Sequence, residues 1–150
     1  MIMLNELIQN AAKLMHEQAV AYARLDAACQ HLCTALINGQ PEQIERLTRG
    51  GEAELLNMRA RLVQLMAALS AFAEEPAGAA ALDHDTRVAF RDASNELLEA
   101  AQSYQRARAR AATLAHNGAA FAASGIENCG VPPTTYRAPY SRSGGATRWA

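Results

Sequence analysis

The chain has 150 residues, half of them hydrophobic, and a formal net charge of −1 at pH 7. This charge argues against a protein that binds nucleic acid, because neutralising phosphates requires an excess of basic residues. The sequence shows neither an apolar run long enough to cross a bilayer nor the pattern of a signal peptide, so we expect a cytoplasmic protein without membrane insertion. Three cysteines, an odd number, predict free thiols rather than a disulfide framework.

The first segment, from about 4 to 37, repeats apolar residues at helical spacings of three and four. Its seven-residue repeat, typical of a coiled coil, is broken only by Gln18. A second apolar column runs beside the first and makes the stripe broad. We therefore expect more than one neighbour to bury this helix. The second column consists of Ile8, Met15, Tyr22, Cys29 and Leu36.

A short break separates the first helix from a second one, expected from about 41 to 73. Gly39 can adopt the left-handed conformation that ends a helix, and Pro41 suits the first turn of the next. The short turn predicts an antiparallel return. Adjacent glycines, Gly50 and Gly51, each cost about 1 kcal/mol relative to alanine inside a helix, so we expect an unwinding, bend or break there. The apolar stripe of this helix contains Ile44, Leu47, Gly51, Leu55, Met58, Leu62, Leu65, Leu69 and Phe72.

A third helix is expected from about 83 to 123, with Asp83 or Asp85 as its cap. The apolar face of its second half consists mostly of alanine and glycine. At about 1.5 Å per residue this helix is longer than the first, so its last turns should extend past the other two. Such an extension would leave Leu114 and Phe121 without an internal partner and available to another helix.

The sequence thus predicts an all-α fold, an elongated antiparallel three-helix bundle. The bundle domain is expected at 1–123, followed by a flexible tail at 124–150 that is rich in Gly, Pro, Ser and Tyr. Alanine is abundant, and it is the strongest helix former.

No arrangement of side chains indicates catalysis or metal binding. Cys29 and Cys33 share a helical face, but His31 points elsewhere and no second pair of ligands follows. The Glu-x-x-His pairs of di-iron bundles and the phosphate-binding loop of nucleotide hydrolases are both missing. We therefore expect a protein that is not an enzyme and has no catalytic residues, cofactor or metal. A histidine phosphotransfer bundle is a weaker alternative, because His84 and Arg87 lack the glycine found beside a phosphoacceptor histidine.

Two stretches, Leu36–Thr48 (LINGQPEQIERLT) and Glu54–Leu62 (ELLNMRARL), resemble the FlgN-type flagellar export chaperones. In that family a long helix ends at a short break, and a Glu-x-Leu-Leu-like segment then leads into a second, arginine-bearing helix. The resemblance implies a cytoplasmic chaperone of bacterial flagellum biogenesis. It would bind the C-terminal helical segments of hook-associated (hook-filament junction) proteins, prevent their premature assembly and deliver them to the gate of the flagellar type III export apparatus.

This role would place the client on the second half of the third helix. Small residues there would admit a client helix and larger ones would anchor it; the expected client-binding residues are Ala107, Ala111, Leu114, Ala115, Gly118 and Phe121. In the family a tyrosine near the C-terminus is associated with docking to the export gate, and Tyr136 matches it best. A self-associating helical adaptor, with the same stripe forming a homodimer, is the main alternative.

Overall fold

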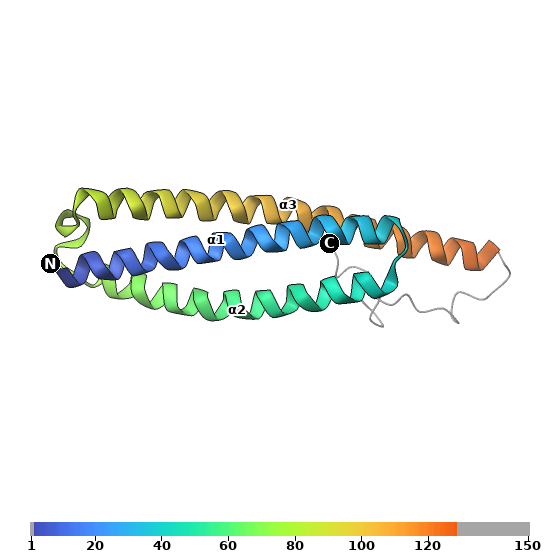
Figure 1. Cartoon of the computed structure of the whole chain (residues 1–150), viewed down its shortest axis with the longest axis horizontal. Coiled ribbons are helices and arrows are strands. Elements are labelled where there is room, and N and C mark those ends of the chain that lie inside the picture. The colour runs from blue at the N-terminus through green and yellow to red at the C-terminus, as the bar shows by residue number, and fades with distance from the viewer. Residues whose placement is uncertain (1, 129–150) are drawn as a thin grey trace.

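The computed structural model describes residues 2–128, which form three long α-helices and one short 3₁₀-helix, with no strand among them. The long helices are α1 (Ile2–Ile37), α2 (Pro41–Ala73) and α3 (His84–Asn128), and η1 (Gly78–Ala81) lies in the connection between α2 and α3 (Figure 1). The all-α class predicted from the sequence is confirmed for these residues.

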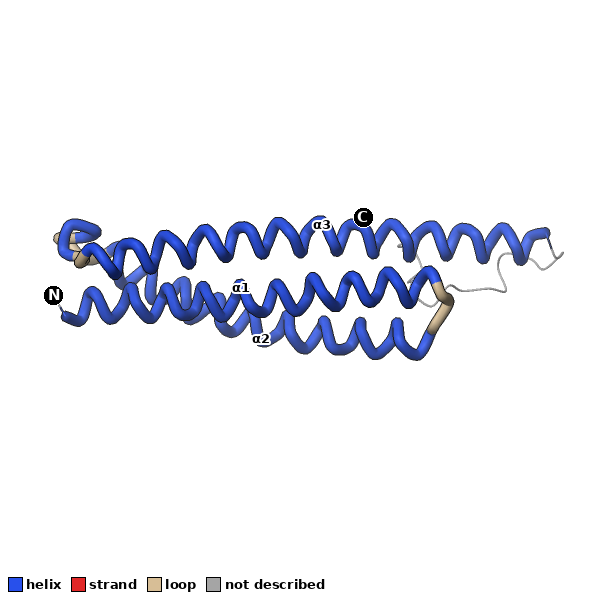
Figure 2. The backbone as a smooth tube through the Cα atoms, turned by 45° about the horizontal axis from the view of Figure 1, so that its top comes forward, coloured by secondary structure: helices blue, strands red, loops and turns tan. Residues whose placement is uncertain are grey.

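Helix α1 is the central element of the fold. It packs against both α2 and α3, whereas α2 and α3 scarcely approach each other (Figures 1 and 2). The prediction that more than one neighbour buries the first helix is therefore confirmed. Much of the buried surface of α1 is alanine, which lets the neighbouring backbones come close. The buried alanines of this helix are Ala11, Ala12, Ala19, Ala21 and Ala35.

The side-chain contacts define the direction of each helix relative to α1. From Asn5 to Asp26 of α1, hydrogen bonds to α3 and its cap join residues that are 77 to 80 positions apart, and a nearly constant offset means that the two helices run parallel. Between α1 and α2 the separation falls from 40 positions at Gln18 to 30 at Arg24, as it must for helices that run in opposite directions. The chain therefore runs up, down and up again.

The C-terminal end of α3 extends beyond the other two helices (Figure 1). At an offset of 77 to 80 residues, Ile37 at the end of α1 lies level with positions 114–117 of α3. We call residues 118–128, which have no α1 residue beside them, the overhang. Helix α3 thus continues past its predicted end at 123, and the remainder of the expected tail, 129–150, lies outside the described residues.

The predicted turn and cap residues are confirmed. Gly39 has a φ of 61°, the left-handed region, and Pro41 begins α2. Of the two candidate caps of α3, the structure selects Asp83, whose Oδ1 accepts a hydrogen bond from the backbone N–H of Thr86 at 2.7 Å. The backbone N–H of Asp83 in turn donates to Oδ1 of Asn5 at 3.1 Å, which ties the start of α3 to α1.

The expected unwinding or break at Gly50 and Gly51 is wrong: α2 is a continuous helix from Pro41 to Ala73, and neither glycine has a positive φ. A β-carbon added to Gly51 would lie 3.8 Å from Cδ2 of Leu25, so the glycine lies against α1. Packing of α2 on α1 on either side of the pair outweighs the low helix propensity of two residues.

Candidate binding surface

Only part of the apolar stripe predicted for α2 is buried. Ile44, Met58 and Leu65 are buried, but Leu55 and Leu62 of the same stripe are exposed. The physical reason is the number of neighbours. The main partner of helix α2 is α1, and one neighbouring helix covers only a narrow seam of its surface.

The exposed large apolar residues of α2 gather on one side of the helix. Five side chains with exposed fractions of 44% to 66% share this side, and we call them the α2 apolar face: Leu55, Leu56, Leu62, Val63 and Met66. Their spacing places them on one side of the helix over about three turns. Single exposed apolar residues are normal, but five large ones on one side of a helix are typical of a surface that another molecule covers.

The contacts of α1 show on which side of the α1–α2 seam this face lies. Glu54 and Arg61 border the seam on one side, where they meet Arg24 and Glu17 of α1. Positions 17 and 24 are about 160° round α1 from positions 15 and 22, which contact α3. Leu55 and Leu62 border the opposite side of the seam. The α2 apolar face therefore begins on the side of α2 that is turned toward α3.

Near the N-terminus of α1 the three helices close over a shared core. There Phe72 of α2 and Phe90 of α3 both pack against the buried residues Leu4, Ile8 and Leu82. Further along the bundle Met58 and Leu65 of α2 still belong to the core, whereas the side chains of the α2 apolar face are exposed. Leu98 of α3, which is level with the middle of α2, is also 57% exposed.

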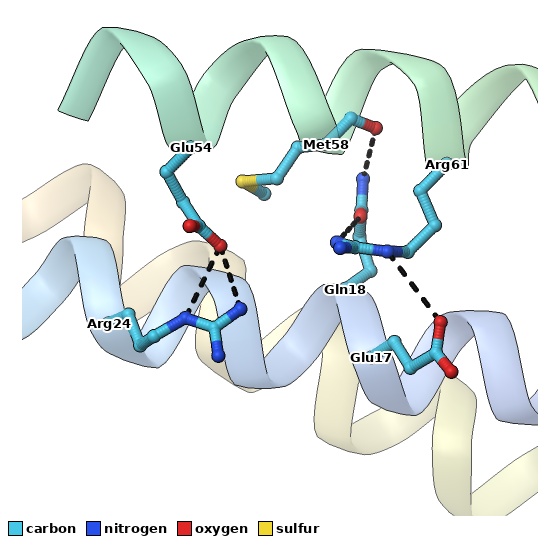
Figure 3. A network of polar contacts seen from close by, with 6 residues as sticks. All are labelled: Glu17, Gln18, Arg24, Glu54, Met58 and Arg61. Carbon is cyan, nitrogen blue, oxygen red and sulfur yellow. Dashed lines mark hydrogen bonds and ion pairs between the residues drawn. The ribbon is translucent and has the colours of Figure 1, made fainter. Parts of the chain in front are cut away.

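A polar network fixes α2 on α1 directly behind the apolar face (Figure 3). Gln18 is 6% exposed, and it donates from Nε2 to the carbonyl oxygen of Met58 at 2.9 Å while its Oε1 accepts from Nη1 of Arg61 at 2.9 Å. Nε of Arg61 also lies 3.7 Å from Oε2 of Glu17. Gln18, which interrupts the apolar heptad repeat, thus has a hydrogen-bond partner for both atoms of its amide. Among the described residues, no buried side-chain N or O atom lacks a hydrogen-bond partner.

The structure separates the client-binding residues predicted on α3 into three groups. Ala107 and Ala111 are buried, each 5% exposed, and lie within the bundle. Leu114 and Ala115 are half-buried near the end of α1. In the overhang, Gly118 is exposed with no atom within 4 Å of an added β-carbon, and Phe121 is 81% exposed. Tyr136 lies outside the described residues.

Sequence reasoning did not identify the α2 apolar face, although the sequence contains a signal for it. Leu56, Val63 and Met66 form additional apolar columns beside the stripe predicted for α2. The apolar surface of α2 is therefore wider than one neighbouring helix can cover.

The described residues contain no group of three or more His, Cys, Asp or Glu side chains that is placed to hold a metal ion. Cys29 and Cys33 are half-buried free thiols. Burial raises the pKa of the Cys29 thiol, and the neighbouring Cys33 and Asp26 raise it further, so this thiol is a poor nucleophile. Across residues 2–128, no helix is long and apolar enough to span a membrane.

Comparison with known proteins gives no relative for this chain: no protein-family model matches it, and neither does any curated protein or any solved structure.

Proposed function

We propose that this chain is a non-enzymatic chaperone that binds an amphipathic helix of a client protein on the α2 apolar face. The observation that carries the proposal is the exposure of five large apolar side chains on one side of a helix whose main partner is α1. Covering each of them removes apolar area from water and contributes about 1.5–3 kcal/mol when burial is complete. A surface of this size suits a complex that protects its client and still releases it.

The spacing of the exposed residues favours a helix as the bound element. Leu55 and Leu62 are one heptad apart, and so are Leu56 and Val63. Side chains at this spacing form the holes into which the residues of a facing helix pack. The three helices make an elongated bundle in which antiparallel α2 and parallel α3 flank α1, and the position beside α2 is open to a fourth helix.

The sequence resemblance supports the identity of the client. The stretch Glu54–Leu62, which resembles the FlgN-type flagellar export chaperones, contains three of the five residues of the α2 apolar face. In this proposal the client helix belongs to the C-terminal segment of a hook-associated protein. The chain binds it in the cytoplasm, keeps it from assembling early and delivers it to the flagellar export apparatus.

The overhang supplies a second contact in this proposal. Phe121 projects from the part of α3 that has no α1 beside it, and its ring is mostly in water. A client segment that continues beyond the α2 apolar face toward this end of the molecule would cover it. Aromatic side chains are frequent anchors at such sites.

The experiment mixes the purified chain with the C-terminal segments of hook-associated proteins from the same genome and measures affinity by calorimetry. Leu62→Glu is expected to weaken binding by about tenfold or more, since it replaces a buried apolar contact with a charge. Gln64→Glu is the control, because this exposed position lies about 140° round the helix from the centre of the face. Phe121→Asp tests the overhang separately. The proposal fails if no segment binds, or if Leu62→Glu binds as tightly as Gln64→Glu.

A further inference from the structure

Arg59 lies at the centre of the α2 apolar face. Its neighbours on the helix surface, three and four residues away in each direction, are all exposed and apolar: Leu55, Leu56, Leu62 and Val63. Arg59 itself is exposed. The face is therefore an apolar surface with one positive charge in its middle.

Arg59 is one of several arginines of the described residues without an ion-pair partner, and what distinguishes it is its position among exposed apolar side chains. Arg24, Arg49, Arg61 and Arg91 each lie within 4.0 Å of a carboxylate oxygen. Within residues 2–128, no such pair involves Arg59. A carboxylate on the same helix could reach Arg59 only from three or four residues away. Those positions are occupied by leucine and valine.

A helix that covers the α2 apolar face also covers the base of the Arg59 side chain and takes water from its guanidinium group. Burying a charge without a partner is strongly unfavourable, whereas a carboxylate that meets the guanidinium in bidentate geometry compensates for the lost water. The face therefore selects its occupant by charge as well as by apolar pattern.

We infer that the occupant of the α2 apolar face is an amphipathic helix of another protein that carries a Glu or Asp within its apolar stripe, placed to pair with Arg59. This inference rests on the proposed function and adds the chemistry by which the client is recognised. An arginine or lysine at the same position of the client would be rejected, because it would place two like charges together in a surface from which water is excluded.

The same charge disfavours a second copy of the chain as the occupant. Two copies that paired face to face about a two-fold axis would place the centre of one face on the centre of the other, whether the axis runs along α2 and gives parallel helices or across it and gives antiparallel ones. Arg59 would then face Arg59 of the second copy. A symmetric dimer through this surface therefore has a repulsive contact at its centre, and an acidic client helix does not.

A lipid surface fits the face less well than a helix does. Helices that lie on membranes carry their basic residues on the polar side and bury an uninterrupted apolar side among the lipid chains. Here the basic residue, Arg59, is in the middle of the apolar side, so membrane binding would bring its charge against the lipid hydrocarbon, which is energetically unfavourable. The seven-residue spacing of the face also matches a facing helix rather than a fluid surface.

The test uses three synthetic helical peptides of about three heptads that differ at one central stripe position, which is Glu, Gln or Arg. Their affinities for the full chain are measured by fluorescence anisotropy, with Arg59→Glu as the variant. Arg46→Glu is the matched control, because Arg46 is exposed on the same helix about 140° away from Arg59. Circular dichroism verifies that each variant keeps the helical content of the parent chain.

The Glu peptide is expected to bind the parent chain at least about tenfold more tightly than the Arg peptide, and Arg59→Glu should reverse this order. Arg46→Glu should leave the order unchanged. Equal binding of all three peptides, lost in Leu62→Glu, would overturn the role of Arg59 and leave the proposed function intact. Binding of no peptide would overturn both.

Two further measurements test the other occupants. If sedimentation shows a dimer that Leu62→Glu dissociates, the occupant is a second copy and the inference is overturned. It is also overturned if the chain binds phosphatidylglycerol vesicles through the same leucine and does not prefer the Glu peptide.

Discussion

Nε2 of Gln18 on α1 donates a hydrogen bond to the backbone carbonyl of Met58 on α2, at 2.9 Å. The other atom of the same amide, Oε1, accepts from Arg61 at 2.9 Å. A buried polar residue at an apolar position of a heptad repeat specifies the register of its partner helix, because a shifted register would leave it unpaired. The pair Gln18–Met58 thus determines how α2 lies on α1, and with it where the α2 apolar face is presented.

Replacement of Gln18 by alanine should destabilise the chain by about 1–3 kcal/mol, since it leaves Nη1 of Arg61 without its partly buried acceptor and opens a gap in the seam. Urea unfolding followed by circular dichroism measures the change. The control, Gln64→Ala, alters an exposed glutamine of α2 and should stay within about 0.5 kcal/mol of the parent. Equal stabilities of the two variants would show that the polar network contributes nothing.

The glycines of α2 and the glycine of the turn before it should respond to alanine in opposite directions. Gly51→Ala should stabilise the chain by about 0.5–1 kcal/mol, because the new β-carbon makes an ordinary contact at 3.8 Å with Leu25 and helix propensity improves. Gly50→Ala should act in the same direction, since nothing lies within 4 Å. Gly39→Ala should destabilise it, because its φ is 61°. Thermal unfolding of the three variants measures these effects, and a destabilising Gly51→Ala would contradict the continuous α2.

The cap of α3 should make stability depend on pH in the acid range. Hydrogen bonds from the side chain and then the backbone of Thr86 lower the pKa of Asp83 from its ordinary value of 3.8. A carboxyl whose pKa is lower in the folded state stabilises the fold fully above the unfolded value and loses that effect as the pH falls through the folded value. Asp83→Ala should therefore lower the unfolding temperature at pH 7, and the difference from the parent chain should shrink below pH 3.8.

The matched control for this cap is Asp85→Ala, which changes an exposed aspartate in the same turn. It should leave the difference between pH 7 and acid unchanged relative to the parent. If Asp83→Ala and Asp85→Ala follow the same pH profile, the hydrogen bond from Thr86 does not stabilise α3.

The thiol of Cys29 should react slowly in the folded chain. Burial, Cys33 and Asp26 all raise its pKa above the ordinary value of 9.0, so little thiolate is present near neutral pH. A Cys33→Ser, Cys129→Ser variant leaves Cys29 as the single thiol, and its alkylation at pH 8 should be several-fold slower in buffer than in denaturant. A rate in buffer equal to that of the unfolded chain would show that this side chain is neither desolvated nor protected.

The sequence was sufficient to predict the all-α class, the left-handed turn at Gly39 and a cap at Asp83 or Asp85, because each depends on interactions among nearby residues, and the structure selects Asp83. It also predicted that α1 has two neighbours, since the width of an apolar stripe reports how many helices cover it. The break expected at Gly50 and Gly51 was wrong because helix propensity is local, whereas the continuity of α2 comes from its packing along α1.

The candidate site was the part that the sequence did not determine. A repeat shows which side of a helix is apolar, but it does not show whether the chain has another helix to cover that side. Leu55 and Leu62 fit the core pattern of α2 as well as the buried Met58 does. Only the arrangement of the helices reveals that α3 lies too far from α2 to cover them. For the same reason Ala107, expected on the binding surface, is buried beside α1.

The most direct test of the account is site-specific photo-cross-linking of the full chain to full-length hook-associated proteins. The probe p-benzoylphenylalanine replaces Val63 in the α2 apolar face, Phe121 in the overhang or Gln64 on the opposite side of α2. The account predicts a client cross-link from Val63 and none from Gln64, with Phe121 reporting whether the client reaches the overhang. Cross-links of equal yield from Val63 and Gln64, or none from Val63, would contradict the claim that this face holds the client.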